Sequence, residues 1–297
     1  MPELGPTGPA TALAGVLEQQ GSAVLEAVEE LREDLVGSIH RTRVAVRRLR
    51  STLVLFRRVL EQPAAGRLEE RLRWFAGELG PARDAQVVRV RLVDAAARLD
   101  LDPERAEALL AGFDQENQDA WLRAAGVLAD PRTDQLCATL RTAHLTPAAA
   151  RTREWRLLPR IQAQLDRLLA KAGAAVRDPS DATRMHRLRK RVKRVRFAVA
   201  AVREDGVSLL PAGSGAGQVV TALAELQELL GEYQDAVVTQ EVLAVLGTRS
   251  PGLRDVMASL VADQRSQVDA VVAVLPERID QVERAVRRLR RRTGRRD

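Results

Sequence analysis

Two segments of this 297-residue chain, 146 positions apart, carry the same arrangement of histidine and arginine. The first reads His40-Arg41-Thr42-Arg43-Val44-Ala45-Val46-Arg47-Arg48-Leu49-Arg50 and the second reads His186-Arg187-Leu188-Arg189-Lys190-Arg191-Val192-Lys193-Arg194-Val195-Arg196, with six of eleven positions identical. A second shared motif follows each basic segment. It reads Leu79-Gly80-Pro81-Ala82-Arg83-Asp84-Ala85-Gln86-Val87 after the first and Leu230-Gly231-Glu232-Tyr233-Gln234-Asp235-Ala236-Val237-Val238 after the second, with five of nine positions identical. This order predicts a duplicated helical unit with halves of about 130 residues. The alternative is that Arg-rich helices resemble one another by composition.

Apolar residues recur at helical spacing along almost the whole chain, with little of the alternation typical of strands. The chain is therefore predicted to be all-α and built as helical bundles. We expect the left-handed cap of a helix end at Gly80 and at Gly231, because each follows a leucine at a predicted end. The predicted helices are 11–34, 38–61, 64–79, 82–99, 103–128, a shorter piece between 131 and 146, 153–177, 181–203, 218–230, 232–247, 252–275 and 277–292.

Each basic segment separates into an apolar stripe and a basic stripe when its residues are placed on a helix. The apolar stripes are Ile39, Thr42, Val46, Leu49, Leu53, Phe56 and Leu60 in the first segment, and Met185, Leu188, Val192, Val195, Val199 and Val202 in the second. The adjoining basic rows are His40, Arg43, Arg47 and Arg50, and His186, Arg189, Lys193 and Arg196. Arg41, Arg48, Arg187 and Arg194 lie on a neighbouring face.

The positive charge is concentrated in three segments. Ile39 to Leu60 carries +7, Arg184 to Arg203 carries +9 and Arg284 to Asp297 carries +7, whereas the whole chain carries +7, so the remainder is acidic. The first two segments contain no acid at all, although like charges at i, i+3 and i+7 destabilise a helix. We interpret the two rows as facing one long anion, because guanidinium groups form paired hydrogen bonds with phosphate oxygens. The alternative is a solvated charged face.

Composition and motifs exclude several classes of site. The single cysteine, Cys137, excludes an intrachain disulfide framework, and three histidines leave little for a histidine-rich metal site. His144 has no counterpart in the repeat, and we read it as a loop residue. No apolar run approaches the ~20 residues that span a bilayer, and the start of the chain has no signal-peptide pattern, so we expect a cytoplasmic protein. No Walker, G-x-S-x-G or H-E-x-x-H motif occurs, and we predict neither catalysis nor a cofactor.

The chain resembles the CHAD domain (conserved histidine α-helical domain) over roughly residues 12 to 275. The resemblance is carried by the paired motifs His40-Arg41-x-Arg43-x3-Arg47-Arg48-Leu49-Arg50 and Leu79-Gly80-x2-Arg83-Asp84, with their counterparts from His186 and Leu230. The resemblance implies two pseudo-symmetric four-helix bundles around a basic surface that binds inorganic polyphosphate. The ligands it implies are His40, Arg43, Arg47, Arg50, His186, Arg189, Lys193 and Arg196, with Arg83 as a further candidate. We extend the predicted site to Arg41, Arg48, Arg187 and Arg194. Gln234 stands where the first motif has Arg83, which predicts a weaker end of the site.

The predicted organisation is a disordered N-terminus (1–11), a CHAD-like domain (12–275, with halves about 12–145 and 150–275), and an extra helix with a basic tail (276–297). We predict a non-enzymatic protein that binds polyphosphate and associates with polyphosphate granules. Nucleic-acid binding along the same rows is the alternative, disfavoured because single-strand binders stack bases on aromatic side chains that the rows lack. We expect His40 and His186 to take up protons on binding, while Arg47 and Lys193 stay charged. The alternative is that both histidines are neutral packing residues. Asp84 and Asp235 either suit a helix N-terminus or orient an arginine of the rows.

Overall fold

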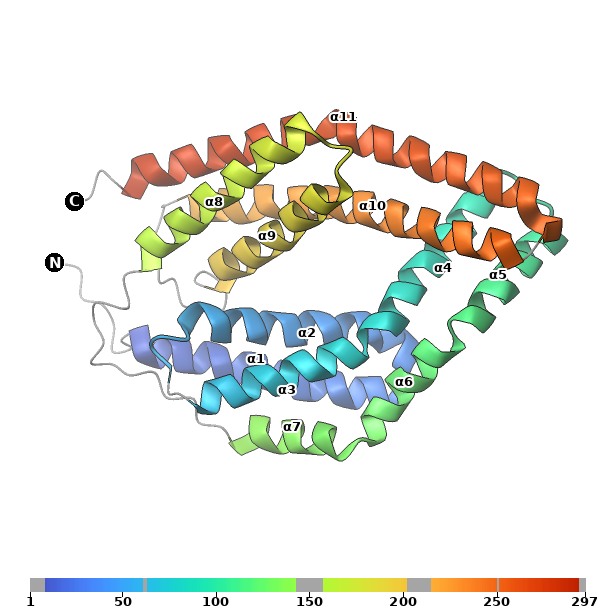
Figure 1. Ribbon diagram of the computed structural model, residues 1–297. Helices are drawn as coiled ribbons and strands as arrows, with labels where there is room; N and C mark the ends of the chain where they lie inside the picture. Colours follow the sequence, from blue (N-terminus) through green and yellow to red (C-terminus); the bar gives the residue numbers. More distant parts are fainter. Residues whose placement is uncertain (1–8, 61–62, 143–156, 202–214, 250, 294–297) are drawn as a thin grey trace.

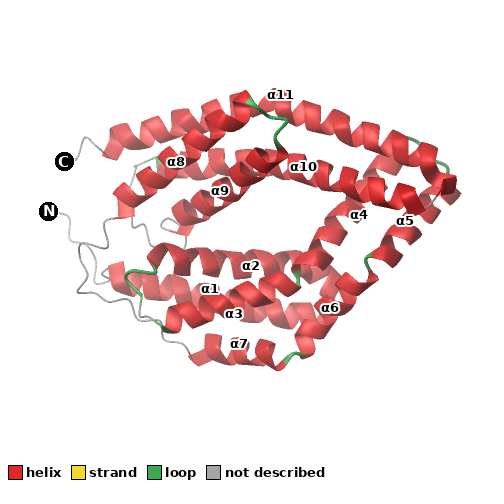
Figure 2. Cartoon of the chain, viewed as in Figure 1, coloured by secondary structure: helices red, strands yellow, loops and turns green. Residues whose placement is uncertain are grey.

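The computed structural model describes residues 9–60, 63–142, 157–201, 215–249 and 251–293, and these residues form helices and no strand (Figures 1 and 2). The helices are α1 (Pro9–Glu33), α2 (Leu35–Phe56), α3 (Ala64–Glu78), α4 (Gly80–Arg98), α5 (Pro103–Glu116), α6 (Gln118–Ala129), α7 (Pro131–Thr142), α8 (Leu157–Arg177), α9 (Ala182–Ala201), α10 (Ala216–Arg249) and α11 (Arg254–Thr293), with a 3-10 turn, η2 (Pro251–Leu253), before α11. No helix in the described part of the chain is long and apolar enough to cross a membrane.

Eight of these helices form two four-helix bundles. In the first, α1 contacts α2 and α7, and α3 contacts the same two helices, which closes a ring. In the second, α9 contacts α8 and α10, and α11 contacts α10 and α8 in the same way. The bundles meet where α2 packs against α9 (Figure 1). The predicted all-α fold with two four-helix bundles is confirmed, whereas the internal duplication stays a prediction.

The apolar stripes predicted on the two basic helices form part of the core. Every predicted stripe residue of the first segment, from Ile39 to Leu60, is buried. In α9 the stripe is buried from Met185 to Val199, and Val202 lies outside the described residues. Burying one such leucine or valine contributes about 1.5–3 kcal/mol to folding. This burial fixes the orientation of both helices and therefore the direction in which their basic rows point.

A second, smaller core lies at the other end of the molecule. There α4 extends away from the first bundle and packs against α5, α10 and α11. The core contains residues from both halves of the sequence, including Leu92, Leu109 and Phe113 from the first half and Leu243 and Leu260 from the second. The helix α4 therefore joins the two bundles in addition to the direct contact between α2 and α9.

Several predicted helix ends are wrong. Gly80 is the first residue of α4 and Gly231 lies inside α10, and neither has the positive φ of a left-handed cap. The first motif breaks the helix because Pro81 follows Gly80 and lacks a backbone N–H, whereas Glu232 follows Gly231 and lets α10 continue. Pro276 likewise lies inside α11, with buried residues on both sides of it. The predicted helix 103–128 is divided at Asn117, where no proline or glycine marks the break.

The domain boundaries stay a prediction, although the structure bears on two of them. The predicted disordered N-terminus includes residues 9–11, which belong to α1, and its other residues lie outside the described ones. The boundary at 276 falls inside α11, whose Ile279, Val286 and Leu289 pack in the main core. The basic tail from Arg284 is thus helical up to Thr293. His144 and the predicted loop 204–214 lie outside the described residues.

Candidate anion-binding site

The two basic rows meet where α2 packs against α9, and the start of α4 adds a further arginine. Burial, followed by repulsion from nearby arginines of these helices, lowers the pKa values of His40, Arg47 and Lys193. With the contact between α2 and α9, this indicates that the cations lie near one another. We call this group the central cluster. It consists of His40, Arg43 and Arg47 from α2, Arg83 from α4, and Arg189, Lys193 and Arg196 from α9.

Arg47 lies at the middle of the central cluster. Burial, followed by repulsion from Arg43, Arg196, Arg189 and Arg83, lowers the pKa of Arg47 to about 10. Its Nε is buried without a hydrogen-bond partner among the described residues. Its guanidinium carbon lies 5.4 Å from the centre of the Phe197 ring, and that of Arg196 lies 4.7 Å from the same ring. Such contacts favour a cation over the ring.

Lys193 is the most perturbed cation of the cluster. Burial lowers its pKa to about 7, with further lowering by Arg189, Arg47 and Arg43 and an opposing effect of Asp235. Within the described residues, its ammonium forms no hydrogen bond or ion pair. Lys193 is therefore a half-buried amine whose charge depends on what lies beside it.

Gly80 makes room for Arg43. The Nη1 of Arg43 donates a 2.7 Å hydrogen bond to the carbonyl oxygen of Ala76 in the last turn of α3. A Cβ at position 80 would lie 3.2 Å from that Nη1. Burial lowers the pKa of Arg43, Asp84 opposes this effect and Arg83 adds to it. The glycine of the first motif thus serves the close approach of a functional side chain as well as the helix break.

Two acids lie at the edge of the central cluster. An oxygen of Asp235 lies 3.7 Å from Nη2 of Arg189, and Asp235 opposes the lowered pKa values of Arg83 and Lys193. Burial raises the pKa of Asp235 itself. Asp235 lies in the middle of α10, so the helix N-terminus interpretation is wrong there, and the carboxylate lies beside an arginine of the rows instead. Asp84 lies just inside α4 and interacts with both Arg43 and Arg83.

The outer members of the rows have partners of their own. Arg50 forms an ion pair of 2.9 Å with Glu69 of α3. His186 Nδ1 lies 2.8 Å from Oε1 of Gln234, and Arg196 donates from Nε to Gln227 at 3.1 Å. Gln234 thus lies beside His186. Its counterpart in the first motif, Arg83, interacts with His40 instead: burial lowers the pKa of that imidazole, and the charge of Arg83 lowers it further.

Four predicted site residues lie away from the central cluster. Arg41, Arg48, Arg187 and Arg194 are exposed, and helical spacing places them on the other side of α2 or α9 from the two rows. Arg41 forms an ion pair of 3.1 Å with Glu30 of α1. The structure therefore does not bring these four side chains together with the central cluster.

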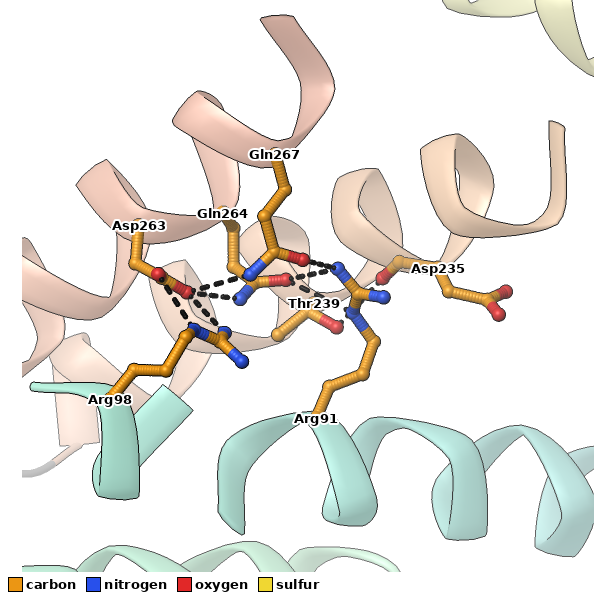
Figure 3. A network of polar contacts seen from close by, with 7 residues as sticks. All are labelled: Arg91, Arg98, Asp235, Thr239, Asp263, Gln264 and Gln267. Carbon is orange, nitrogen blue, oxygen red and sulfur yellow. Dashed lines mark hydrogen bonds and ion pairs between the residues drawn. The ribbon is translucent and has the colours of Figure 1, made fainter. Parts of the chain in front are cut away.

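The sequence did not single out Arg91, which extends the polar contacts along α4. Its Nη2 and Nε donate to Oε1 of Gln264 at 2.8 and 3.0 Å, and Nη2 also donates to Gln267 (Figure 3). Asp263 accepts hydrogen bonds from both glutamines and pairs with Arg98 at 2.7 Å. Gln264 is fully buried, so this network joins α4 to α11. The only feature of the sequence that points to this network is the spacing of seven residues between Arg91 and Arg98, which places both on the same side of a helix.

A metal centre finds no support at this site or elsewhere in the described part of the chain. No group of three or more His, Cys, Asp or Glu side chains is arranged there to hold an ion. Cys137 is buried, and burial raises the pKa of its thiol. The chemistry that the central cluster offers is the binding of anions by several fixed cations.

The chain is similar to known sequences. The family model of the CHAD domain matches residues 15–244. Two uncharacterized Mycobacterium tuberculosis proteins, MT2285 of strain CDC 1551 and Rv2226 of strain H37Rv, are each 29% identical over 248 residues. Each match covers 80% of this chain and 46% of the relative, so the chain spans about half the length of these relatives.

Two solved structures share the fold. The crystal structure of the CHAD domain from the plant Ricinus communis is 25% identical, with a TM-score of 0.64 over 93% of this chain and 91% of that one. PptA from Streptomyces chartreusis has a TM-score of 0.70 at 23% identity, over 92% of this chain and 99% of that one, and this likeness concerns the fold alone. Because the family model spans both basic helices and runs from α1 into α10, this chain belongs to the CHAD domain family.

Proposed function

We propose that this protein binds inorganic polyphosphate at the central cluster and does not catalyse a reaction on it. The observation that carries the proposal is the convergence of cations from α2, α4 and α9 at a single place, with few acids among them. A chain of phosphates supplies closely spaced negative charges, which would relieve the repulsion that lowers the pKa of Arg47 and Lys193. Arginine at most of these positions suits phosphate oxygens, because its donors are fixed in a planar fork.

The aromatic residue at the cluster does not favour nucleic acid as the ligand. Phe197 is only 6% exposed, and Arg47 and Arg196 lie over its ring. A base stacks on an aromatic face that is accessible, and this face is covered. Polyphosphate has no bases and requires no such platform.

The test is direct binding of labelled long-chain polyphosphate, with single-stranded RNA, duplex DNA and orthophosphate as competitors at near-physiological salt. We expect polyphosphate to bind best, with a log–log salt slope of about −4 to −6 for six to eight neutralised phosphates. RNA that competes with equal potency would overturn the choice of ligand, and a flat salt response would overturn the electrostatic mechanism.

Two further measurements test the site and the absence of catalysis. The double variant Arg47→Ala/Lys193→Ala is expected to weaken binding strongly, whereas the matched control Arg123→Ala/Arg265→Ala removes two exposed arginines on other helices. Equal binding by both variants, with unchanged melting temperatures, would place the ligand elsewhere. Release of orthophosphate, or shortening of the polyphosphate during incubation, would contradict a purely binding function.

A further inference from the structure

The helix α9 is basic around its whole circumference except for its buried stripe. At 100° per residue, a second set of cations lies on the opposite side of the helix from the row that faces α2. Lys190 lies between the row and this second set. Within α9 there is no acidic residue. The second set consists of Arg187, Arg191 and Arg194.

The neighbouring helix α8 adds cations to this second set. Arg167 of α8, which packs against α9, lies close enough to Arg191 to repel it, and Lys171 lies one turn further along the same side of α8. Arg167, Lys171, Arg187 and Arg194 are all exposed. We call these five residues, Arg167, Lys171, Arg187, Arg191 and Arg194, the outer basic face.

Arg191 is the central residue of the outer basic face. Its Nε and Nη2 are buried and have no hydrogen-bond partner among the described residues. Burial lowers its pKa, and Arg167 and Arg194 lower it further, with no acid opposing them. A guanidinium held in this way costs stability, because its donors have lost water without gaining an acceptor. An anion bound over this face would offset the repulsion that Arg191 experiences from Arg167 and Arg194.

The acids near this face are engaged elsewhere. The single acid of α8, Asp166, pairs with Arg290 of α11 on the other side of α8. Asp178 and Asp181, in the turn between α8 and α9, both pair with Arg184. The described residues therefore provide no carboxylate that neutralises the outer basic face.

The corresponding face of the first bundle has a neutralising carboxylate and lacks the half-buried guanidinium. Arg41, which matches Arg187 at the offset of the repeat, pairs with Glu30 of α1 at 3.1 Å. Ala45 stands at the position of Arg191, so the half-buried guanidinium has no equivalent there. If the four-helix bundle itself required unneutralised cations on this face, both bundles would have them. Only the second bundle does, so the cations on α8 and α9 need another explanation.

We propose that the outer basic face is a second binding surface for polyphosphate, continuous around α9 with the central cluster, so that one long chain occupies both. The proposal rests on the proposed function, because it takes the same ligand for both surfaces. It predicts that the protein discriminates by chain length: tripolyphosphate fills the central cluster alone, and a long chain continues over Lys190 onto α8.

The test compares wild type with the variant Arg167→Gln/Lys171→Gln/Arg191→Gln, which leaves every cation of the central cluster in place. Titration with long-chain polyphosphate at about 0.15 M salt is expected to show a loss of about tenfold or more in affinity, and a salt slope reduced by about 2. Affinity for tripolyphosphate is expected to stay within twofold. The control, Arg67→Gln/Arg123→Gln/Arg265→Gln, removes the same charge from exposed positions on α3, α6 and α11.

Each outcome decides a separate question. Loss of long-chain affinity that is equal in the test and control variants would overturn the second surface, because it would reflect net charge alone. A test variant that binds long chains normally but loses RNA binding would assign the face to nucleic acid instead. If wild type binds neither tripolyphosphate nor the long chain, the proposed function fails before the variants are compared. Thermal melting shows whether the test variant is folded, and replacing the half-buried Arg191 is expected to leave its melting temperature unchanged or raised.

Discussion

Polyphosphate binding should be coupled to protonation of Lys193. In the free protein its pKa is about 7, so about half of the molecules carry an uncharged amine at neutral pH. A bound phosphate chain favours the ammonium and raises this pKa toward the ordinary value of about 10.4. The complex therefore holds a proton that the free protein partly lacks, and affinity falls as pH rises. Between pH 6 and pH 8 the loss due to Lys193 is about tenfold, which equals about 1.4 kcal/mol.

The variant Lys193→Arg isolates this effect, because arginine stays charged over the same range. We expect it to bind polyphosphate more tightly than wild type at pH 8 and to lose most of the pH dependence. His40 contributes in the same direction, since burial and the nearby arginines lower its pKa, and His40→Gln is expected to remove a smaller part at the acidic end.

The assay is titration calorimetry at pH 6, 7 and 8 in buffers of different ionisation enthalpy, which reports both affinity and protons taken up. At pH 7 wild type is expected to take up about half a proton through Lys193. If Lys193→Arg keeps the complete pH dependence and proton uptake of wild type, the amine is not the coupled group. The expectation from sequence that Lys193 does not titrate near neutrality disagrees with its lowered pKa.

Three further outcomes follow from the packing. Gly231→Ala is expected to stabilise the protein by about 0.5–1 kcal/mol in urea unfolding, because an added Cβ meets nothing within 4 Å in the middle of α10; a lower midpoint would contradict this. Truncation before Arg284 is expected to lower the melting temperature markedly, since the loss of buried Leu289 alone costs about 2–5 kcal/mol, and an unchanged melting temperature would show that the end of α11 is dispensable. Asp235→Asn is expected to raise polyphosphate affinity about threefold, or about 0.7 kcal/mol, and to lower stability because Arg189 loses its carboxylate; weaker binding would show that this acid positions the site.

The sequence predicts the faces of the helices better than their ends. Ile39, Val46 and Leu53 recur at helical spacing, and burial of such a stripe is the main contribution to packing, so the pattern predicts the core directly. Helix ends depend on single residues and their surroundings. Pro276 predicted an end, yet α11 continues through it, with Leu275 and Ile279 buried on either side.

The candidate site was predictable to a similar degree. The spacing of Arg43, Arg47 and Lys193 places each on the correct face of its helix. It does not show that Glu69 neutralises Arg50, because that acid comes from α3, or that the packing of α2 against α9 buries the amine of Lys193. These facts depend on which helices become neighbours, which no local pattern encodes.

The path of α4 has a consequence for dividing the molecule. Because α4 extends from the first bundle into the core that it shares with α10 and α11, each half of the sequence supplies one side of that core. A polypeptide ending before α8 would expose Leu92 and Phe113, and one beginning at α8 would expose Leu243 and Leu260. The two fragments should therefore behave as complementing partners: insoluble or aggregating when expressed singly, and recovered as a folded heterodimer when expressed together.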